Sequence, residues 1–177
     1  PPYSLLEHGS ERFEDFLLFL GEKVDLLGWK EFDGGLDTKK DRTGKHSIFA
    51  RWLDFEIMFH VSTYLPLLSG EERIMERKKH IGNDLTAIVF LDSPTIKFVR
   101  PLVSGDFWRL YSCNHLISPT DTFVVVRPLE NDQYQVEVAV REGVPLFGPA
   151  LPKPNIFSKG EHLRDFIISK SKNPSTE

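Results

Sequence analysis

Residues 47–63, SIFARWLDFEIMFHVST, form the stretch that decides the fold class. Two runs rich in aromatic and β-branched residues, Ser47–Leu53 and Phe55–Thr63, predict the strands of a tight hairpin. The second run alternates between two sets of side chains: Ile57, Phe59 and Val61 on one face, and Glu56, Met58 and His60 on the other. A strand with this pattern is expected to bury its first face in a core and leave the other half exposed to water.

Helical patterns lie on both sides of this hairpin. An amphipathic helix is expected from the N-cap Ser10 to the stop at Gly21, with apolar residues at helical spacing: Phe13, Phe16, Leu17 and Leu20. Ser69 with Glu72 and Ser158 with Glu161 have capping-box spacing, so each predicts a further helix start. The last of these helices would present an apolar stripe of Leu163, Phe166 and Ile167.

Other strands are predicted along the chain: Val24–Leu27, Thr86–Leu91, and a second hairpin of Thr122–Arg127 and Tyr134–Val140 around Glu130–Asp132. A polar, glycine-rich loop is expected from Gly28 to Lys45, and the four prolines of Val144–Pro154 predict extended chain. Residues 92–120 carry no clear pattern. Five or so strands with about three helices in mixed order favour an α/β or α+β layered domain.

Composition limits the classes of function. The 177 residues suit one globular domain, and a net charge of −4 argues against a surface built throughout for nucleic acid. A single cysteine, Cys113, excludes an internal disulfide, so a reducing cytosol is the expected compartment. No stretch approaches eighteen apolar residues, and the start at Pro1 lacks an initiator Met, which favours an excised domain of a larger protein.

Several motifs fail as catalytic or binding sites. Gly44-Lys45 resembles the end of a phosphate-binding Walker A loop, but eight residues separate Gly35 from Gly44 and His46 follows the lysine, so the spacing is wrong. Three loop carboxylates, Asp33, Asp37 and Asp41, lack the spacing of a calcium loop and are expected to be solvated turn residues.

No metal site or nucleophile is predicted elsewhere. The six histidines are scattered without zinc spacing, and His60 is expected to be a packed or half-exposed strand side chain. Ser62, Ser69 and Cys113 lie in no nucleophile motif. Hydrolytic chemistry performed by this chain alone is therefore not expected.

Residues 77–84, RKKHIGND, form a concentrated positive segment in an acidic chain. One interpretation is a solvated helix end whose cations face the C-terminal dipole before a glycine stop. A nuclear localisation signal has a similar composition, but a position inside a predicted α/β core argues against it. Periodicity alone favours the solvated helix end.

The chain also resembles the Rap GTPase-activating domain family along most of its length. Four segments look like signature blocks of that family in the family's order: Gly34–Asp37, Glu56–Thr63, Lys78–Asp84 and Val144–Pro149. The His-Ile-Gly-Asn-Asp block is the most specific, because its asparagine is the catalytic "asparagine thumb" of the family. The resemblance therefore implies that Asn83 is the catalytic residue.

The resemblance implies further properties. The fold would be an α/β domain with a central mixed β-sheet flanked by helices, similar in layout to a G domain, over residues 1–177. The activity would be stimulation of GTP hydrolysis by a GTP-bound, Rap-type small GTPase, so the chain would not be an enzyme in its own right. GTP and Mg²⁺ would be carried by the partner, with no cofactor or metal of the chain's own. The location would be cytoplasmic, with recruitment to the membranes where the GTPase resides.

The partner surface implied by the resemblance is cationic, formed by Arg77, Lys78, Lys79 and His80. The family usually has arginine where this chain has Lys79, and an ammonium group lacks the planar fork of a guanidinium. The family also carries an N-terminal dimerisation half and an opening strand that have no counterpart here, so homodimerisation would depend on regions outside this chain.

Two other functions remain open at this stage. A non-catalytic scaffold of the same fold would use the positive segment only to bind a GTPase or another protein. A nucleic-acid-binding module would use Arg73, Arg77, Lys78 and Lys79 with nearby aromatic residues, against the net charge of −4.

Overall fold

The computed structural model describes residues 9–66, 80–81, 84–93, 120–141, 143–145 and 147–171. The chain divides into two compact units, Pro1–Gly82 and Asn83–Glu177, and each is described by itself. The predicted helix that begins near Ser69 and the poorly patterned residues 94–119 lie outside the described residues.

The first unit begins with helix α1 (Glu11–Leu20), as predicted. The Ser10 hydroxyl accepts a 3.1 Å hydrogen bond from the Phe13 N–H and thereby satisfies one of the free donors at the helix start. At the other end, the Gly21 N–H donates to the Leu17 carbonyl. Phe16, Leu17 and Leu20 are buried, so the apolar stripe read from the sequence is confirmed as the packed face.

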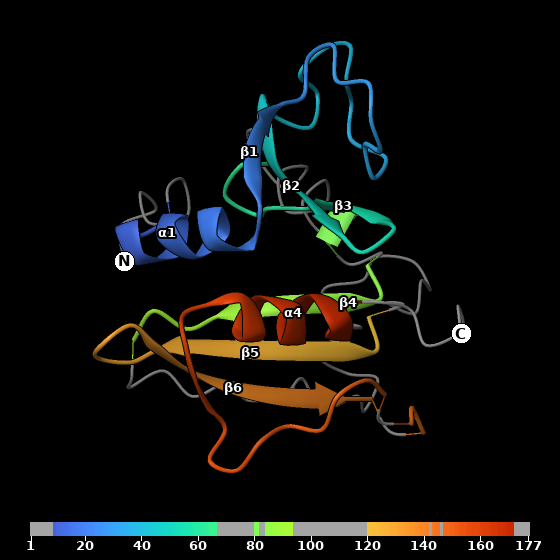
Figure 1. Ribbon diagram of the computed structural model, residues 1–177. Coiled ribbons are helices and arrows are strands. Elements are labelled where there is room, and N and C mark those ends of the chain that lie inside the picture. Colours follow the sequence, from blue (N-terminus) through green and yellow to red (C-terminus); the bar gives the residue numbers. More distant parts are fainter. Residues whose placement is uncertain are drawn as a thin grey trace, which may run out of the picture. The chain divides into compact units, whose positions relative to one another are not determined.

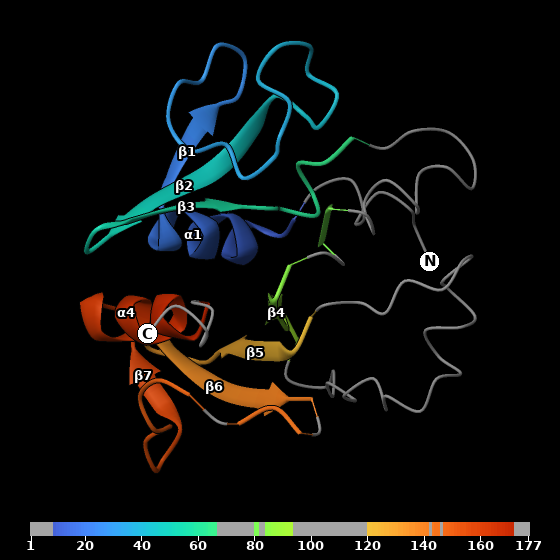
Figure 2. The same cartoon turned by 90° about the vertical axis from the view of Figure 1, so that its right-hand side faces the viewer.

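The first unit also contains an antiparallel sheet in the order β1-β2-β3 (Figures 1 and 2). The strands are β1 (Glu22–Asp25), β2 (His46–Trp52) and β3 (Phe55–Phe59). The predicted hairpin is confirmed, with Arg51 opposite Glu56. Strand β3 ends four residues before Thr63, and β1 begins two residues before Val24, so both boundaries differ from the prediction.

Buried side chains lie on both faces of this sheet, and on the second face Glu56 is exposed and His60 half-buried, in agreement with the expected half-exposed face. On the face of α1, Leu17, Ile48 and Val61 form one buried cluster, with Phe59 packed against it. On the other face Met58 is only 7% exposed and belongs to a second buried cluster with these residues: Val24, Leu26, Leu36, Phe49 and Leu65. Met58 is buried because the chain between β1 and β2 returns over this face and supplies Leu36.

The loop between β1 and β2 is held by its own polar side chains. A carboxylate oxygen of Asp33 accepts a 2.8 Å hydrogen bond from the Gly35 N–H. The Asp37 carboxylate accepts hydrogen bonds from the backbone N–H groups of Lys39 and Lys40. These bonds hold the pKa of Asp37 below its usual value, and the bond from Lys39 has the largest effect. The carboxylates of Asp33 and Asp37 thus cap turns, as the sequence predicts.

The second unit is built on a mixed sheet in the order β4-β5-β6-β7. Its strands are β4 (Thr86–Phe90), β5 (Thr122–Pro128), β6 (Gln133–Val140) and β7 (Ile156–Ser158). Strand β4 runs parallel to β5, and the other pairs are antiparallel. The β5–β6 hairpin is confirmed, and its turn residues Asn131 and Asp132 have φ values of 56° and 53°, which short polar side chains tolerate.

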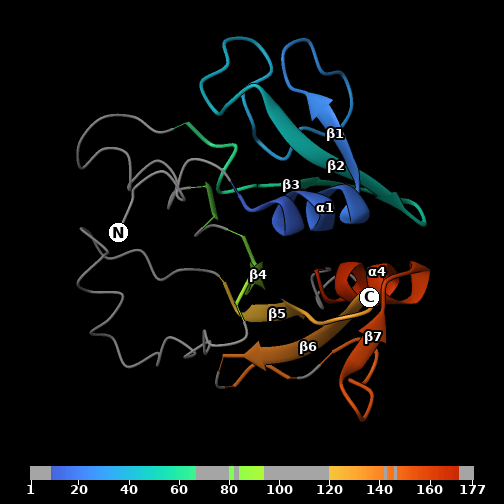
Figure 3. The ribbon, with the colours of Figure 1, turned by 90° about the vertical axis from the view of Figure 1, so that its left-hand side faces the viewer.

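Helix α4 (Glu161–Lys170) packs against β5 and β7 in this unit, as Figure 3 shows. Its predicted apolar stripe of Leu163, Phe166 and Ile167 is buried. The predicted capping box is wrong, because Gly160 is the N-cap and no side chain caps the helix start. Ser158 instead ends β7, where it lies opposite Gln133 of β6.

The α/β class is confirmed by this arrangement, and the four-stranded sheet is the mixed one. The strands of the described residues fall into two sheets, one in each unit. Within residues 144–154, the described positions contain neither helix nor strand, in agreement with the extended chain predicted from the four prolines.

Candidate functional site

The structure places only part of the predicted site. His80 and Ile81 are described and helical, and Asp84 is described, whereas Arg77, Lys78, Lys79 and Asn83 lie outside the described residues. The described residues nearest to Asn83 in sequence are His80 and Ile81 in the first unit and Asp84 in the second.

His80 is seated against a residue from a distant part of the sequence. Its imidazole ring lies 5.7 Å from that of His60, centroid to centroid, with an interplanar angle of 71°, which is an edge-to-face contact. His60 directly follows β3, and its Nε2 lies 2.9 Å from the Gly34 carbonyl oxygen. Since a carbonyl only accepts hydrogen bonds, Nε2 carries a proton and donates it. The packed histidine expected at position 60 is confirmed.

Ile81 anchors the same segment to the core of the first unit. Its partly buried side chain packs against the buried cluster of Met58, Leu26, Leu36 and their neighbours. Ile81 thus contacts the core through its apolar side chain, and His80 contacts His60 through its ring. Three of the four segments that carry the family resemblance, represented by Gly34, His60 and His80, are in this way brought together.

Gly34 accounts for the close approach of the loop. Its φ of +61° lies in the left-handed region, and a Cβ at this position would stand 3.1 Å from the Cβ of Met58. Glycine suits this position because a larger residue would be strained at this φ and would crowd the Met58 side chain. The carbonyl of Gly34 consequently stays within hydrogen-bond reach of His60.

The residues that follow Asn83 are fixed in the second unit. The Thr120 hydroxyl donates a 2.7 Å hydrogen bond to the Asp84 carbonyl. The Leu85 carbonyl accepts from the N–H groups of Asp121 and Thr122 at 2.9 and 3.2 Å. The Thr86 hydroxyl donates to the carbonyl of Lys170 at the end of α4. Asp84 and Leu85 are therefore held through their backbone carbonyls, and Thr86 is held through its side chain.

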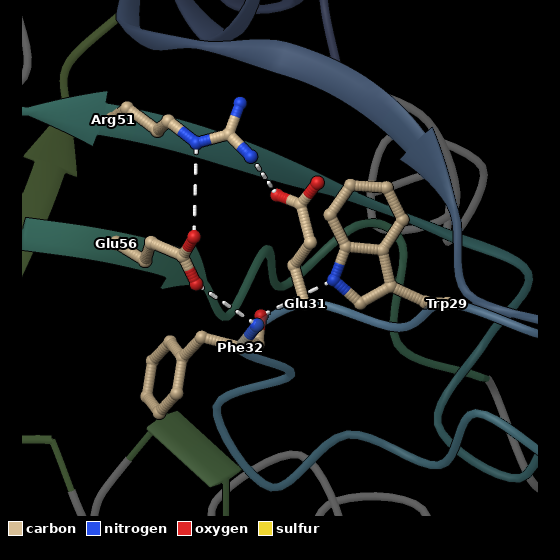
Figure 4. A network of polar contacts seen from close by, with 5 residues as sticks. All are labelled: Trp29, Glu31, Phe32, Arg51 and Glu56. Atoms are coloured by element: carbon tan, nitrogen blue, oxygen red, sulfur yellow. Dashed lines mark hydrogen bonds and ion pairs between the residues drawn. The ribbon is translucent and has the colours of Figure 1, made fainter.

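A polar network fastens the loop before Gly34 to the β2–β3 hairpin (Figure 4). Arg51 of β2 pairs with Glu31 and lies 3.6 Å from Glu56 of β3 through Nε. A Glu56 oxygen accepts from the Phe32 N–H at 3.2 Å, and the Trp29 indole N–H donates to the Phe32 carbonyl at 3.2 Å. Arg51 and Glu31 lie 20 residues apart in the sequence, and Phe32 and Glu56 lie 24 apart. No local sequence pattern predicts contacts over such separations.

Lys170 is a buried cation that the sequence analysis missed. It is 5% exposed, its Nζ donates to the Phe147 carbonyl, and the ammonium lies 5.6 Å from the ring centroids of Phe147 and Phe166. Burial lowers the pKa of Lys170. This side chain holds the fourth segment of the family resemblance, Val144–Pro149, against α4.

Neither a metal centre nor a membrane helix is found in the described part of the chain. Within it, no three side chains of His, Cys, Asp or Glu gather as a metal site would require. Among the same residues, no helix has the length and apolar character needed to cross a bilayer.

A family comparison identifies the domain. The pattern of the Rap/ran-GAP family matches residues 4–176. The chain belongs to the Rap/ran-GAP family. This confirms the resemblance drawn from the four sequence segments.

Curated relatives of the Rap/ran-GAP family are similar over nearly the whole chain. "GTPase-activating Rap/Ran-GAP domain-like protein 3" of Homo sapiens is 41% identical over 169 residues, which cover 93% of this chain and 15% of that protein. "Signal-induced proliferation-associated 1-like protein 1" of Mus musculus is 38% identical, and the match covers 93% of this chain and 9% of that protein. "RapA guanosine triphosphatase-activating protein 1" of Dictyostelium discoideum is 31% identical, and the match covers 91% of this chain and 19% of that protein. The chain thus spans less than a fifth of the length of each.

A solved structure supports the same fold. "Structure of the TSC2 GAP domain" superposes with a TM-score of 0.72 at 25% identity, covering 93% of this chain and 83% of that one. The Rap/ran-GAP fold is therefore shared at the level of the whole domain.

Proposed function

We propose that this chain stimulates GTP hydrolysis by a Rap-type small GTPase, with Asn83 as the residue that orients the attacking water. The observation that carries the proposal is the match of the Rap/ran-GAP family to residues 4–176, which include the segment that contains Asn83. His80 and Ile81 are seated in the first unit, and the Asp84 carbonyl is held by Thr120 in the second.

The chemistry of a carboxamide fits this role. GTP hydrolysis is limited by positioning the water and stabilising charge on the transferred phosphoryl group. The Asn83 oxygen can accept a hydrogen bond from the water while its NH₂ donates to a γ-phosphate oxygen. Aspartate cannot supply the second contact, because its ionised carboxylate only accepts. No arginine needs to enter the active site, and GTP and Mg²⁺ come with the partner GTPase.

The neighbouring cations have a different task in this proposal. Arg77, Lys78, Lys79 and His80 offer a positive surface to an acidic region of the GTPase. Such a surface raises the rate of encounter and sets the approach of the partner. Binding and the chemical step would accordingly be sensitive to different residues.

The test is single-turnover GTP hydrolysis by a panel of Rap, Ral and Rheb-type GTPases with wild-type protein, Asn83→Ala and Asn83→Asp. Wild type should stimulate at least one Rap-type GTPase, and Asn83→Ala should lose about a hundredfold or more of this stimulation while still binding. Asn83→Asp should be as poor as Ala.

The outcomes separate catalysis from adhesion. If Asn83→Ala keeps more than half of the stimulation, Asn83 is not the water-orienting residue. If wild type binds a GTPase without accelerating hydrolysis, the chain is a non-catalytic scaffold of the same family. Stimulation of Ral or Rheb-type GTPases alone would correct the partner class but not the mechanism.

A further inference from the structure

We infer that Phe32 is an apolar anchor for the GTPase and extends the docking surface from His80 along one face of strand β3. The inference rests on the function proposed above, because its partner is the same small GTPase. It concerns binding alone and requires nothing of the chemical step.

The side chain of Phe32 is exposed, whereas its backbone is held on both sides. Phe32 is 53% exposed, and its ring points away from the Trp29 indole (Figure 4). Its N–H donates to Glu56 at 3.2 Å, and its carbonyl accepts from the Trp29 indole N–H at 3.2 Å. The Trp29 ring in turn packs edge to face on the buried ring of Phe49, 5.1 Å away between centroids. A ring presented from a fixed backbone loses little conformational freedom when a partner covers it, which favours affinity.

The charged groups around Phe32 pair with one another. The Arg51 guanidinium pairs with Glu31 and lies 3.6 Å from Glu56. A partner that covers Phe32 therefore meets an apolar centre with an ion-paired rim, which is the usual anatomy of a protein interface. Such a contact adds affinity that depends little on salt, in contrast to the cationic segment of residues 77–80.

Phe32 and His80 lie along the same face of the sheet. Phe32 is bonded to Glu56, whereas the Gly34 carbonyl is bonded to His60, whose ring touches that of His80. Four residues of nearly extended chain separate Glu56 from His60, a distance of about 13 Å. A standard interface covers roughly 800 Å² of each partner, a patch about 30 Å across. A GTPase that docks on His80 can therefore cover Phe32 as well.

The surface fits a partner of defined chemistry. Its cationic part suits an acidic region of the GTPase, and Phe32 suits an apolar pocket beside that region. Aromatic side chains that become buried in such pockets are frequent hot spots of binding energy. Phe32 should accordingly set how tightly the GTPase is held, while the cations set how fast it arrives.

The test is equilibrium binding to a small GTPase loaded with a non-hydrolysable GTP analogue, together with stimulated hydrolysis on the same GTPase. Phe32→Ala removes the ring and keeps both backbone hydrogen bonds, so the fold should persist, and thermal midpoints check this. Phe32→Leu keeps an apolar side chain. Leu18→Ala is the matched control, because Leu18 is 55% exposed and lies on α1, which packs on the opposite face of the sheet.

Phe32→Ala should raise the dissociation constant and the Michaelis constant about tenfold, with the turnover number within about twofold of wild type. Phe32→Leu should recover part of the lost affinity, and Leu18→Ala should match wild type. The association rate should depend on salt equally in Phe32→Ala and wild type, because an apolar contact carries no charge.

The remaining outcomes separate this inference from the proposed function. Wild-type affinity in Phe32→Ala, or an equal loss in Leu18→Ala, overturns the anchor role and leaves the proposed function standing. If wild type binds a GTPase without accelerating hydrolysis and Phe32→Ala weakens that binding, the catalytic proposal fails and the anchor role holds. If wild type binds none of the Rap, Ral and Rheb-type GTPases, both are overturned.

Discussion

The hydroxyl of Thr120 donates a 2.7 Å hydrogen bond to the backbone carbonyl of Asp84, 36 residues earlier in the chain. Thr120 is 8% exposed, so little water can replace it as a donor. This contact fixes the first residue after Asn83 by a side chain that sequence patterns did not identify.

Thr120→Val tests this contact because it keeps the shape of the side chain and removes the donor. We expect the free energy of unfolding to fall by about 1 kcal/mol, measured by urea denaturation, since a partly buried carbonyl loses this partner. GTPase stimulation should also fall at saturating partner. Thr63→Val is the control, because the Thr63 hydroxyl is buried and makes no hydrogen bond within the described residues. Equal losses in the two variants would contradict the prediction.

Gly34→Ala should destabilise the chain more than Gly35→Ala. Both glycines have φ in the left-handed region, +61° and +84°, so both substitutions carry a conformational cost of roughly 1 kcal/mol. Only Gly34 adds a steric conflict, since its Cβ would meet the Met58 side chain while nothing lies within 4 Å at Gly35. Thermal and urea unfolding of both variants measure the difference. A larger effect at Gly35 would mean that the loop does not pack on β3 as described.

Lys170→Met should change how stability depends on pH. Burial lowers the pKa of Lys170 from the ordinary value of 10.5, so between the two values the unfolded chain holds a proton that the folded chain has lost. The free energy of unfolding contributed by this group therefore rises with pH across that interval. The Met variant should lack this rise, whereas Lys153→Met, at an exposed lysine of the same unit, should keep it. Urea titrations from neutral to alkaline pH give the comparison, and parallel curves for wild type and Lys170→Met would exclude the effect.

Charge reversal at Lys78 and Lys79 to Glu should slow association with the GTPase and raise the Michaelis constant much more than it lowers turnover. The reason is a local cationic cluster in a chain of net charge −4. Exposed charges act over about one Debye length, near 8 Å at physiological salt. Stopped-flow association rates should fall with salt for wild type and not for the variant. An equally flat response in both proteins would remove this segment from the docking surface.

The parts of the fold that the sequence predicts are those with local physical causes. Ser10 caps α1 three residues from its donor, and Asn131 and Asp132 adopt the positive φ of a hairpin turn that their own side chains favour. Ser158 has the correct spacing to cap α4, yet it pairs with Gln133 in the sheet. That pairing depends on a strand 25 residues away, and no local pattern encodes it.

The same distinction holds at the candidate site. The resemblance points to Asn83 and the adjacent cations through one contiguous segment. The residues that hold this segment, His60 with Gly34 and Thr120, come from distant parts of the chain. Met58 shows the reason, since its burial depends on a returning loop and not on the alternation of its own strand.

The boundary between the two compact units falls between Gly82 and Asn83, inside the most specific segment of the family resemblance. Each unit has its own sheet, so heat can in principle melt one before the other. Because the segment Lys78–Asp84 has residues in both units, inactivation on heating is expected to follow whichever unit melts first. The working temperature range of the domain is then set by its weaker half, however stable the other half becomes.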